Sequence, residues 1–190
     1  SYSNKKLKET VRVKPLNYYA KTKLMSEKLL LKNKNLFNLC IGRIFSFSSI
    51  NQGINYFIPS VLKKMKSNKK NIVFSNVNHY RDFLSIEDVC SAIKILLDKK
   101  AKGIFNICSS KKIYLIDIIN TLNMKNKKIN FKHNDNQSIL IGNNLKLKKL
   151  GWKVKYNKLI MGKPSYDVIV DDKSLNYKKN WFSDFEKKIK

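Results

Sequence analysis

Glycine is scarce in this sequence, and its few copies stand far apart. A loop that cradles the pyrophosphate of a dinucleotide needs three glycines within about six residues, directly after a strand. No two glycines here are that close, so these 190 residues contain no loop of that kind. The six glycines are Gly42, Gly53, Gly103, Gly142, Gly151 and Gly162.

Cysteine and histidine are equally sparse, which excludes the common metal and disulfide frameworks. Cys40, Cys90 and Cys108 form no C-x-x-C pair, and His79 and His133 are the only histidines. We therefore expect no metal site and no disulfide, which fits a reducing, cytoplasmic location. Their apolar neighbours predict that Cys90 and Cys108 are core residues. No apolar run approaches the roughly 18 residues of a membrane-spanning helix, so we expect no membrane partner.

Acidic residues are few, and the positive charge comes almost entirely from lysine. Lys and Arg total 40 against 13 Asp and Glu, a net charge of +27, and arginine occurs only as Arg12, Arg43 and Arg81. Nucleic-acid-binding proteins usually cluster arginine and interleave it with aromatic residues. Here the lysines are scattered, as in proteins from AT-rich coding sequences. We therefore expect no specific nucleic-acid partner, and a basic nucleic-acid-binding protein remains the less favoured alternative. A hydrophobic content of 43% suffices for a packed core.

Helical and strand patterns alternate along the chain, which predicts an α/β fold. Asn17 can cap a helix that ends near Leu31, and Ser85 can cap a helix with Glu87 and Asp88 in its first turn. Strands are expected at 38–47, 71–76, 103–109, 128–133 and 166–172 and at the start of 81–100. Further helices are expected from near Pro59, at 113–123 and at 145–152, the last ended by Gly151.

Tyr19 and Lys23 are the first candidate pair for chemistry. Residues four apart lie on one face of a helix, so the phenol and the ammonium can share the same space. A fixed positive charge favours the phenolate and lowers a tyrosine pKa from its usual value near 10. Such a tyrosine can take a proton from a sugar hydroxyl while hydride leaves the carbon. The bare pattern also arises by chance in a chain this rich in lysine.

The surrounding segment, P-L-N-Y-Y-A-K-T-K-L-M-S-E at 15–27, resembles the P-x-N-x-Y-x-x-S/T-K-x-x-x-E segment of extended short-chain dehydrogenase/reductases. These include the NAD-dependent nucleotide-sugar epimerases and dehydratases. The resemblance places the family's tyrosine at Tyr19, its lysine at Lys23 and its glutamate at Glu27. It implies that Tyr19 is the acid/base and that Lys23 lowers its pKa and holds the nicotinamide ribose of NAD or NADP.

Further segments resemble the same family in the same order. I-G-R-I-F-S-F-S-S at 41–49 matches a family strand at Arg43 and Phe45, with Ser46 in place of the family's asparagine. Y-R-D-F-L-S-I-E-D-V at 80–89 resembles the segment whose arginine contacts the diphosphate of a nucleotide sugar. G-I-F-N-I-C-S-S at 103–110 and L-G-W at 150–152 complete the series. The resemblance implies that Arg81 and Ser46 bind a nucleotide-sugar substrate.

The resemblance also implies an architecture. Residues 1–50 would be the C-terminal part of a Rossmann-like domain with the Tyr-x-x-x-Lys helix, and 51–160 a small α/β substrate-binding lobe. The N-terminal glycine-rich βαβ unit is lacking. Family members commonly form homodimers through the Tyr-Lys helix, where Leu24, Leu30 and Leu31 could supply an apolar face. Epimerisation, dehydration and keto reduction all remain open.

The absent glycine-rich loop and the additional tail at 161–190 each leave an alternative open. Without the glycine-rich loop, the chain could be an inactive truncated or fused remnant that binds no cofactor. Residues 161–190 form a separate tail, in which G-K-P-S-Y-D-V-I-V-D-D resembles the last motif of HAD-type phosphatases. Asp171 and Asp172 would then face magnesium, but the D-x-D nucleophile motif of those enzymes is absent, which favours an acidic turn.

Overall fold

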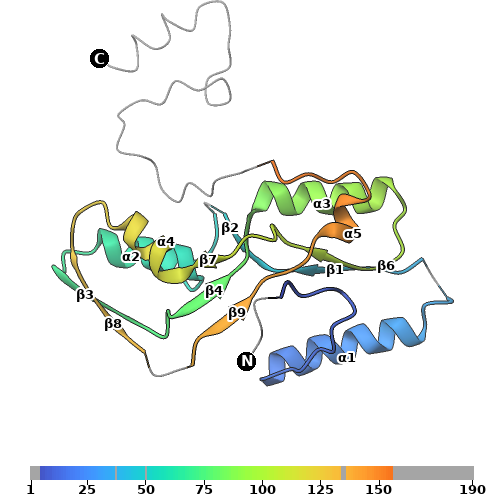
Figure 1. Ribbon diagram of the computed structural model, residues 1–190, viewed down its shortest axis with the longest axis horizontal. Coiled ribbons are helices and arrows are strands. Elements are labelled where there is room, and N and C mark those ends of the chain that lie inside the picture. The colour runs from blue at the N-terminus through green and yellow to red at the C-terminus, as the bar shows by residue number, and fades with distance from the viewer. Residues whose placement is uncertain (1–4, 37, 50, 134–135, 156–190) are drawn as a thin grey trace, which may run out of the picture.

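The computed structural model describes residues 5–36, 38–49, 51–133 and 136–155. Within these residues the chain forms two lobes that lie side by side (Figure 1). The sheet lobe comprises α1 (Tyr18–Lys32), β1 (Cys40–Ile44), β2 (Ser46–Ser48), β5 (Phe83–Ser85), α3 (Ile86–Asp98), β6 (Gly103–Ile107) and α5 (Leu145–Lys148). The small lobe comprises α2 (Phe57–Lys66), β3 (Asn71–Ser75), β4 (His79–Arg81), β7 (Ile113–Tyr114), α4 (Leu115–Leu122), β8 (Lys128–Lys132) and β9 (Ser138–Leu140).

Parallel strand pairs form the centre of the sheet lobe. β1 pairs with β6, with Gly42 opposite Phe105, and β2 pairs with β5, with Ser46 opposite Phe83. α3 covers one face of the β1–β6 pair, and α1 lies along the opposite face (Figure 1). Parallel strands with helices on both faces are typical of doubly wound α/β folds. The predicted α/β class is therefore confirmed.

The small lobe combines short strands with two helices. β3 pairs with β8 in parallel, and β4 lies between β7, which is antiparallel to it, and β9, which is parallel. Side chains alternate along β3, where Ile72 and Phe74 are buried and their neighbours are exposed. α2 and α4 pack against each other, and α4 also contacts β4 and β7. One face of each element therefore supplies the core of this lobe.

The helix starts follow the capping residues seen in the sequence. The Asn17 side chain accepts a hydrogen bond from the backbone N–H of Ala20 at 2.8 Å, so α1 begins at Tyr18. The Ser85 hydroxyl accepts one from the N–H of Asp88 at 3.1 Å, and α3 begins at Ile86. Each cap satisfies one of the backbone donors that a helix leaves unpaired at its start.

Two hydrophobic cores stabilise the lobes, and neighbouring residues of β5 divide between them. Phe83 packs in the core of the small lobe, whereas Leu84 packs in the core of the sheet lobe. The small-lobe core contains Ile58, Val61, Met65, Ile72, Phe74, Val77, Phe83, Leu115, Ile118, Ile119 and Leu122. The sheet-lobe core contains Leu84, Val89, Ala92, Leu96, Phe105, Ile107, Leu147 and Trp152. The chain thus crosses between the lobes several times, and the domain division at residue 50 stays a prediction.

Several elements differ from the prediction. The strand expected at 38–47 is two strands, because the chain leaves its partner β6 after the Phe45 N–H donates to the Ile107 carbonyl at 3.0 Å. β2 then pairs with β5. α2 begins at Phe57, so Pro59 lies within its first turn, where proline costs no helical hydrogen bond. β9 was not predicted.

The prediction for the cysteines was half wrong. Cys108 is fully buried, whereas Cys90 lies on the exposed face of α3. The error arises because the helix turns Val89 and Ala92 inward and leaves Cys90 between them facing outward.

The remaining expectations concern membranes, metals and the tail. Among the described residues, no helix has the length and apolarity needed to cross a membrane. The described residues also contain no group of three or more His, Cys, Asp or Glu side chains that could hold a metal ion. The strand expected at 166–172, with Asp171 and Asp172, lies outside the described residues.

Candidate functional site

Tyr19 and Lys23 lie in the first turns of α1 on one helical face. The ammonium of Lys23 is 5.5 Å from the centroid of the Tyr19 ring. Tyr19 is 71% exposed, so its hydroxyl is open to a ligand. The neighbouring Tyr18 is even more exposed and instead lies under Lys21, 5.2 Å from its ring centroid. The structure thus brings together the pair that the sequence singles out and keeps Tyr18 apart from Lys23.

An ion pair one helical turn after Lys23 holds α1 to the sheet. Arg43 of β1 donates to both carboxylate oxygens of Glu27, with Nε 3.0 Å from Oε2. The same guanidinium donates to the Glu9 carbonyl at 3.0 Å, and the Glu9 carboxylate accepts from the backbone N–H of Asn106 at 3.0 Å. Both side chains of the ion pair are mostly buried. The ion pair therefore fixes the rotation of α1, and Tyr19, two turns before Glu27, remains 71% exposed.

The apolar residues of α1 are distributed differently from the prediction. Leu24 and Leu31 are half-buried on the same side as Glu27, so they face the sheet. Leu30 is 40% exposed, and Met25 and Leu29 are more exposed still. Met25 and Leu29, four residues apart, therefore form an exposed apolar pair on α1. Of the three leucines expected on the exposed face only Leu30 is exposed, and it lies on a different side of the helix from that pair.

Arg81 and Ser46 lie on strands next to the junction of the two lobes. Arg81 is the last residue of β4 and is half-buried, and its Nη1 donates to the carbonyls of Tyr80 at 2.8 Å and Ser138 at 3.3 Å. Burial lowers the pKa of the Arg81 guanidinium from its ordinary value, although an arginine stays charged. Ser46 begins β2 opposite Phe83, only two residues after Arg81. The structure thus places both expected substrate-binding residues in one region.

Two residues of this region were not singled out from the sequence. Glu9 accepts a hydrogen bond from Arg43 through its backbone carbonyl and one from Asn106 through its carboxylate. No sequence motif includes it. Asp82 follows Arg81 directly in the Y-R-D-F segment, so its place in that segment was the available signal. It is fully buried between β4 and β5.

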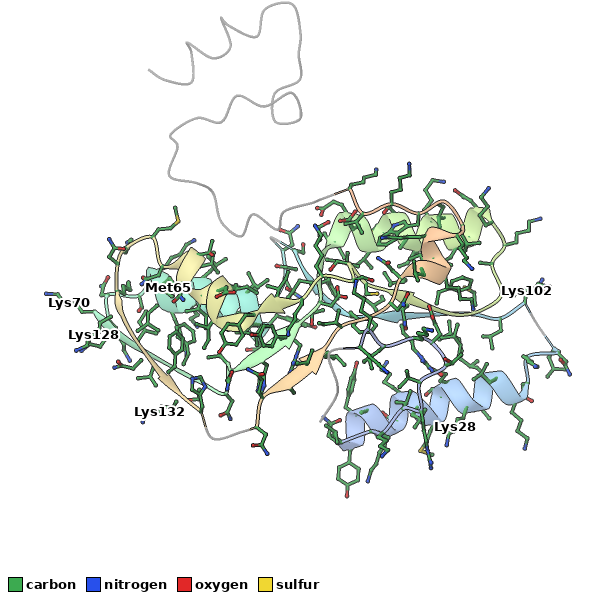
Figure 2. All side chains as sticks on the ribbon, in the orientation of Figure 1. Lys28, Met65, Lys70, Lys102, Lys128 and Lys132 are labelled. Atoms are coloured by element: carbon green, nitrogen blue, oxygen red, sulfur yellow. The ribbon has the colours of Figure 1, made fainter. Side chains whose placement is uncertain are left out.

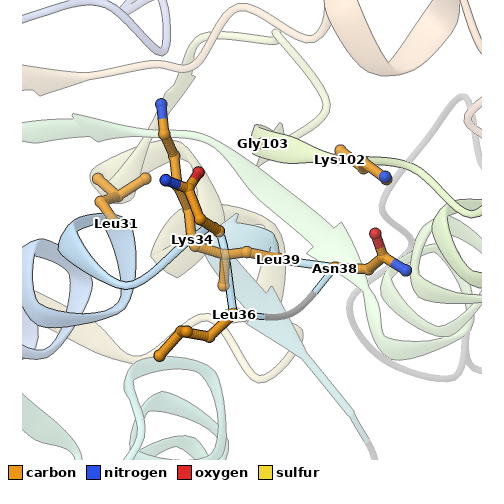
Figure 3. Close-up of a pocket in the computed structure, with 8 residues that line it drawn as sticks. Leu31, Lys34, Leu36, Asn38, Leu39, Lys102 and Gly103 are labelled. Carbon is orange, nitrogen blue, oxygen red and sulfur yellow. The ribbon is translucent and has the colours of Figure 1, made fainter.

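A separate hollow of about 560 Å³ lies at the other end of β1 and β6. Its walls include Leu36 and Leu39 before β1 and Lys102 and Gly103 at the start of β6 (Figure 3). Ligands of parallel α/β sheets bind beyond the carboxyl ends of the strands. The hollow lies at the amino ends, so it is not part of the site formed by Arg81 and Ser46.

The Cys108 thiol is expected to resist modification in the native protein. Burial, and to a lesser degree the nearby Asp82 carboxylate, raises the pKa of Cys108 to about 12. Since the thiolate is the reactive form, a thiol reagent should modify the exposed Cys40 and Cys90 first and Cys108 only after unfolding. Thiol counting before and after denaturant measures this. Cys108→Ala should leave the native count unchanged, and rapid reaction of all three thiols would contradict the buried placement.

Comparison with known proteins places this geometry among related folds. The family model for the NAD dependent epimerase/dehydratase family matches residues 2–108. GDP-6-deoxy-D-talose 4-dehydrogenase of Aggregatibacter actinomycetemcomitans is 29% identical over 106 residues, which make up 55% of this chain and 36% of that relative.

Solved structures share the fold at lower identity. UDP-glucuronic acid 4-epimerase from Bacillus cereus, in complex with UDP-glucuronic acid and NAD, has a TM-score of 0.72 and 22% identity, covering 81% of this chain and 52% of that one. RMD from Pseudomonas aeruginosa, complexed with NADPH, has a TM-score of 0.70 and 22% identity, covering 77% and 54%. This chain therefore spans about half the length of these structures and 36% of the curated relative. With the family model matching more than half of its residues, the chain belongs to the NAD-dependent epimerase/dehydratase family.

Proposed function

We propose that this chain carries the substrate-binding and acid/base part of an NAD(P)-dependent enzyme acting on a nucleotide-diphosphate sugar. The observation that carries the proposal is the register of β2 and β5, which puts Ser46 opposite the residue two after Arg81 in a chain of this family. Arg81 is braced by two backbone carbonyls and is only half-buried, so its remaining N–H groups can reach a ligand. A planar guanidinium suits the paired oxygens of a diphosphate, and Ser46 adds a hydroxyl donor.

Tyr19 is the proposed acid/base. Its hydroxyl is exposed, and the positive charge of Lys23 lies beside its ring. A general acid/base at this position can take the proton of a sugar hydroxyl and return it later in the reaction. Lys23 is proposed to hold the nicotinamide ribose.

The residues of this chain do not form a complete NAD site. Tyr19 and Lys23 suit the ribose, but nothing in the sequence forms a loop for the pyrophosphate. The glycines at the strands serve close packing instead. A side chain at Gly42 would meet Ile107, and one at Gly142 would meet Cys108 and Phe45. Hydride transfer therefore requires a pyrophosphate-binding loop in addition to the residues of these 190 positions.

An interface between two copies through α1 is part of the proposal. Its support is the exposed apolar pair of Met25 and Leu29, with Leu30 also exposed, on a helix that has no fully buried residue. Exposed apolar surface on a helix is a feature of protein interfaces. The lysines do not favour a nucleic-acid partner, because they lie on both lobes. Figure 2 shows Lys28 on α1 and Lys102 before β6, far from Lys128 on β8.

Arg81→Ala is expected to weaken nucleoside diphosphate binding at least about 30-fold, because charge-assisted hydrogen bonds to a buried anion contribute about 2 kcal/mol or more. Calorimetric titration of the wild-type chain and the variant with UDP, GDP and dTDP measures this. Arg12→Ala is the matched control, because Arg12 is exposed and lies before α1, outside the proposed site. Absence of wild-type binding to every nucleotide would favour the inactive remnant instead.

A further inference from the structure

Asp82 is a buried carboxylate at the junction of the two lobes. It lies between β4 and β5, and its side chain has no exposed surface. The residue before it is Arg81, and the two after it are Phe83 in the small-lobe core and Leu84 in the sheet-lobe core. A buried charge is costly unless donors surround it, so its partners show what it does.

Four donors from two separate segments surround this carboxylate. Oδ1 accepts from the backbone N–H of Ser109 at 2.7 Å and from its hydroxyl at 2.6 Å. Oδ2 accepts from the N–H of Ser110 at 2.9 Å and from the N–H of Gly142 at 3.1 Å. Burial raises the pKa of Asp82, and the hydrogen bonds from Ser109, Gly142 and Ser110 oppose that shift. The donors therefore help to keep a charge at a position that is shielded from solvent.

These contacts join three passages of the chain between the lobes. Asp82 itself links β4 of the small lobe to β5 of the sheet lobe. Ser109 and Ser110 lie in the connection from β6 of the sheet lobe to β7 of the small lobe. Gly142 lies in the connection from β9 of the small lobe to α5 of the sheet lobe. One carboxylate therefore ties together three crossings that are distant in sequence.

Arg81 depends on the same crossings for its position. Its Nη1 donates to the Ser138 carbonyl of β9, and β9 leads directly to Gly142. Ser46 lies opposite Phe83, the residue after Asp82. A rotation of one lobe against the other would move Arg81 relative to Ser46 and would break hydrogen bonds of Asp82.

We propose that Asp82 is a positioning residue, whose hydrogen bonds to the β6–β7 and β9–α5 connections hold Arg81 and Ser46 at the separation that a nucleotide diphosphate requires. The proposal rests on the proposed function, in which Arg81 and Ser46 bind that diphosphate. Asp82 itself does not touch the ligand. Its contribution is preorganisation, since a binding site that is already ordered loses less entropy when the ligand binds.

A carboxylate suits this position because it only accepts hydrogen bonds. Two oxygens offer about four acceptor sites, which match the four donors. In Asp82→Asn, the amide NH₂ would replace one of these oxygens and would face N–H donors. The isosteric variant thus keeps the volume of the side chain and removes about half of its accepting capacity.

The test compares Asp82→Asn with Asp88→Asn. Asp88 is equally buried, accepts from the N–H of Lys155 at 2.8 Å and lies at the start of α3, within the sheet lobe. Both variants remove a buried carboxylate, and only Asp82 joins the lobes. Calorimetric titration with UDP, GDP and dTDP, below the unfolding temperature of each protein, should show at least about 10-fold weaker binding for Asp82→Asn and less than about 2-fold change for Asp88→Asn.

Ser109→Ala provides a milder change that leaves the carboxylate in place. It removes the hydroxyl that donates to Asp82 at 2.6 Å and accepts from the Lys111 N–H at 3.1 Å, but keeps the three backbone donors, so we expect a smaller loss of affinity in a stably folded protein. Hydrogen exchange at the amides of Ser109, Ser110 and Gly142 should accelerate in Asp82→Asn more than at the amides of α3. This measurement reports how stable the hydrogen bonds at the lobe crossings are, and it needs no ligand.

The outcomes separate this inference from the proposed function. A wild-type chain that binds no nucleotide would overturn the proposed function, and the positioning role with it. Wild-type binding with unchanged affinity in folded Asp82→Asn would overturn the positioning role alone. Equal losses in Asp82→Asn and Asp88→Asn would do the same, because they would show a general effect of stability. If Asp82→Asn fails to fold, unchanged affinity in Ser109→Ala overturns the proposal and a measurable loss supports it.

Discussion

Replacing Tyr19 with phenylalanine is expected to lower turnover of a nucleotide-diphosphate sugar by at least about 100-fold. The variant loses only the hydroxyl, which is the atom that exchanges a proton with the sugar. Tyr19 is 71% exposed, and phenylalanine keeps its ring, so the change should not disturb the packing of α1. Product analysis by chromatography, with NAD or NADP supplied, measures turnover, and calorimetry measures nucleotide-sugar binding.

Tyr18→Phe is the matched control for this prediction. Tyr18 is the preceding residue on the same helix and is also exposed, but it lies beside Lys21 instead of Lys23. Its loss should leave turnover within about 2-fold of the wild type, since a surface hydroxyl away from the reacting atoms contributes little. Binding should be retained in both variants, because Arg81 and Ser46, the residues proposed to bind the diphosphate, are unchanged.

The contrary outcomes bear on different statements. Equal turnover in Tyr19→Phe and wild type would remove Tyr19 from the mechanism. A stronger effect of Tyr18→Phe would show that the register of the resemblance is shifted by one residue. A wild-type chain that binds nucleotide sugar but shows no turnover would leave the substrate site standing and favour a part that lacks its cofactor loop.

Local signals in the sequence predicted the beginnings of elements well. Asn17 and Ser85 cap helices through hydrogen bonds to residues three positions away, so each cap depends only on its near neighbours. Gly151 has a φ of 93°, in the left-handed region that favours glycine, but α5 already ends at Lys148, so the helix expected at 145–152 is shorter than predicted. The Tyr19–Lys23 pair is local in the same sense. Such features need no knowledge of the tertiary fold.

Features that depend on distant segments were not predicted. The division at Phe45 reflects a change of partner from β6 to β5, and β9 exists because β4 offers it an edge. The donors to Asp82 come from residues 27 to 60 positions away. Neither periodicity nor charge in the sequence therefore predicts that this carboxylate joins several segments. The orientation of Cys90 depends on which side of α3 meets the sheet. Such contacts depend on the tertiary fold, so the local sequence does not reveal them.

Gly142→Ala is expected to lower the free energy of unfolding by about 3 kcal/mol or more. A methyl group there would lie 2.8 Å from Cys108 Cβ and 2.8 Å from Phe45 Cζ, with Cys108 Sγ nearer still. The N–H of Gly142 also donates to Asp82, so the segment cannot shift without lengthening that bond. Gly142 is not among the residues of positive φ, so the cost is steric. Denaturant unfolding followed by circular dichroism measures the loss.

Gly53→Ala is the matched control, because a methyl group there would meet only the ring of Tyr56 at 4.0 Å. We expect a change within about 0.5 kcal/mol for that variant. A double-mutant cycle with Cys108→Gly identifies the clash, since removing Sγ and Cβ frees most of the space that the methyl group needs. The double variant should then lose less stability than the sum of its single changes. Strict additivity would show that the backbone at Gly142 moves away from Cys108 freely, and the tie between this crossing and Asp82 would then be weaker than the hydrogen bonds indicate.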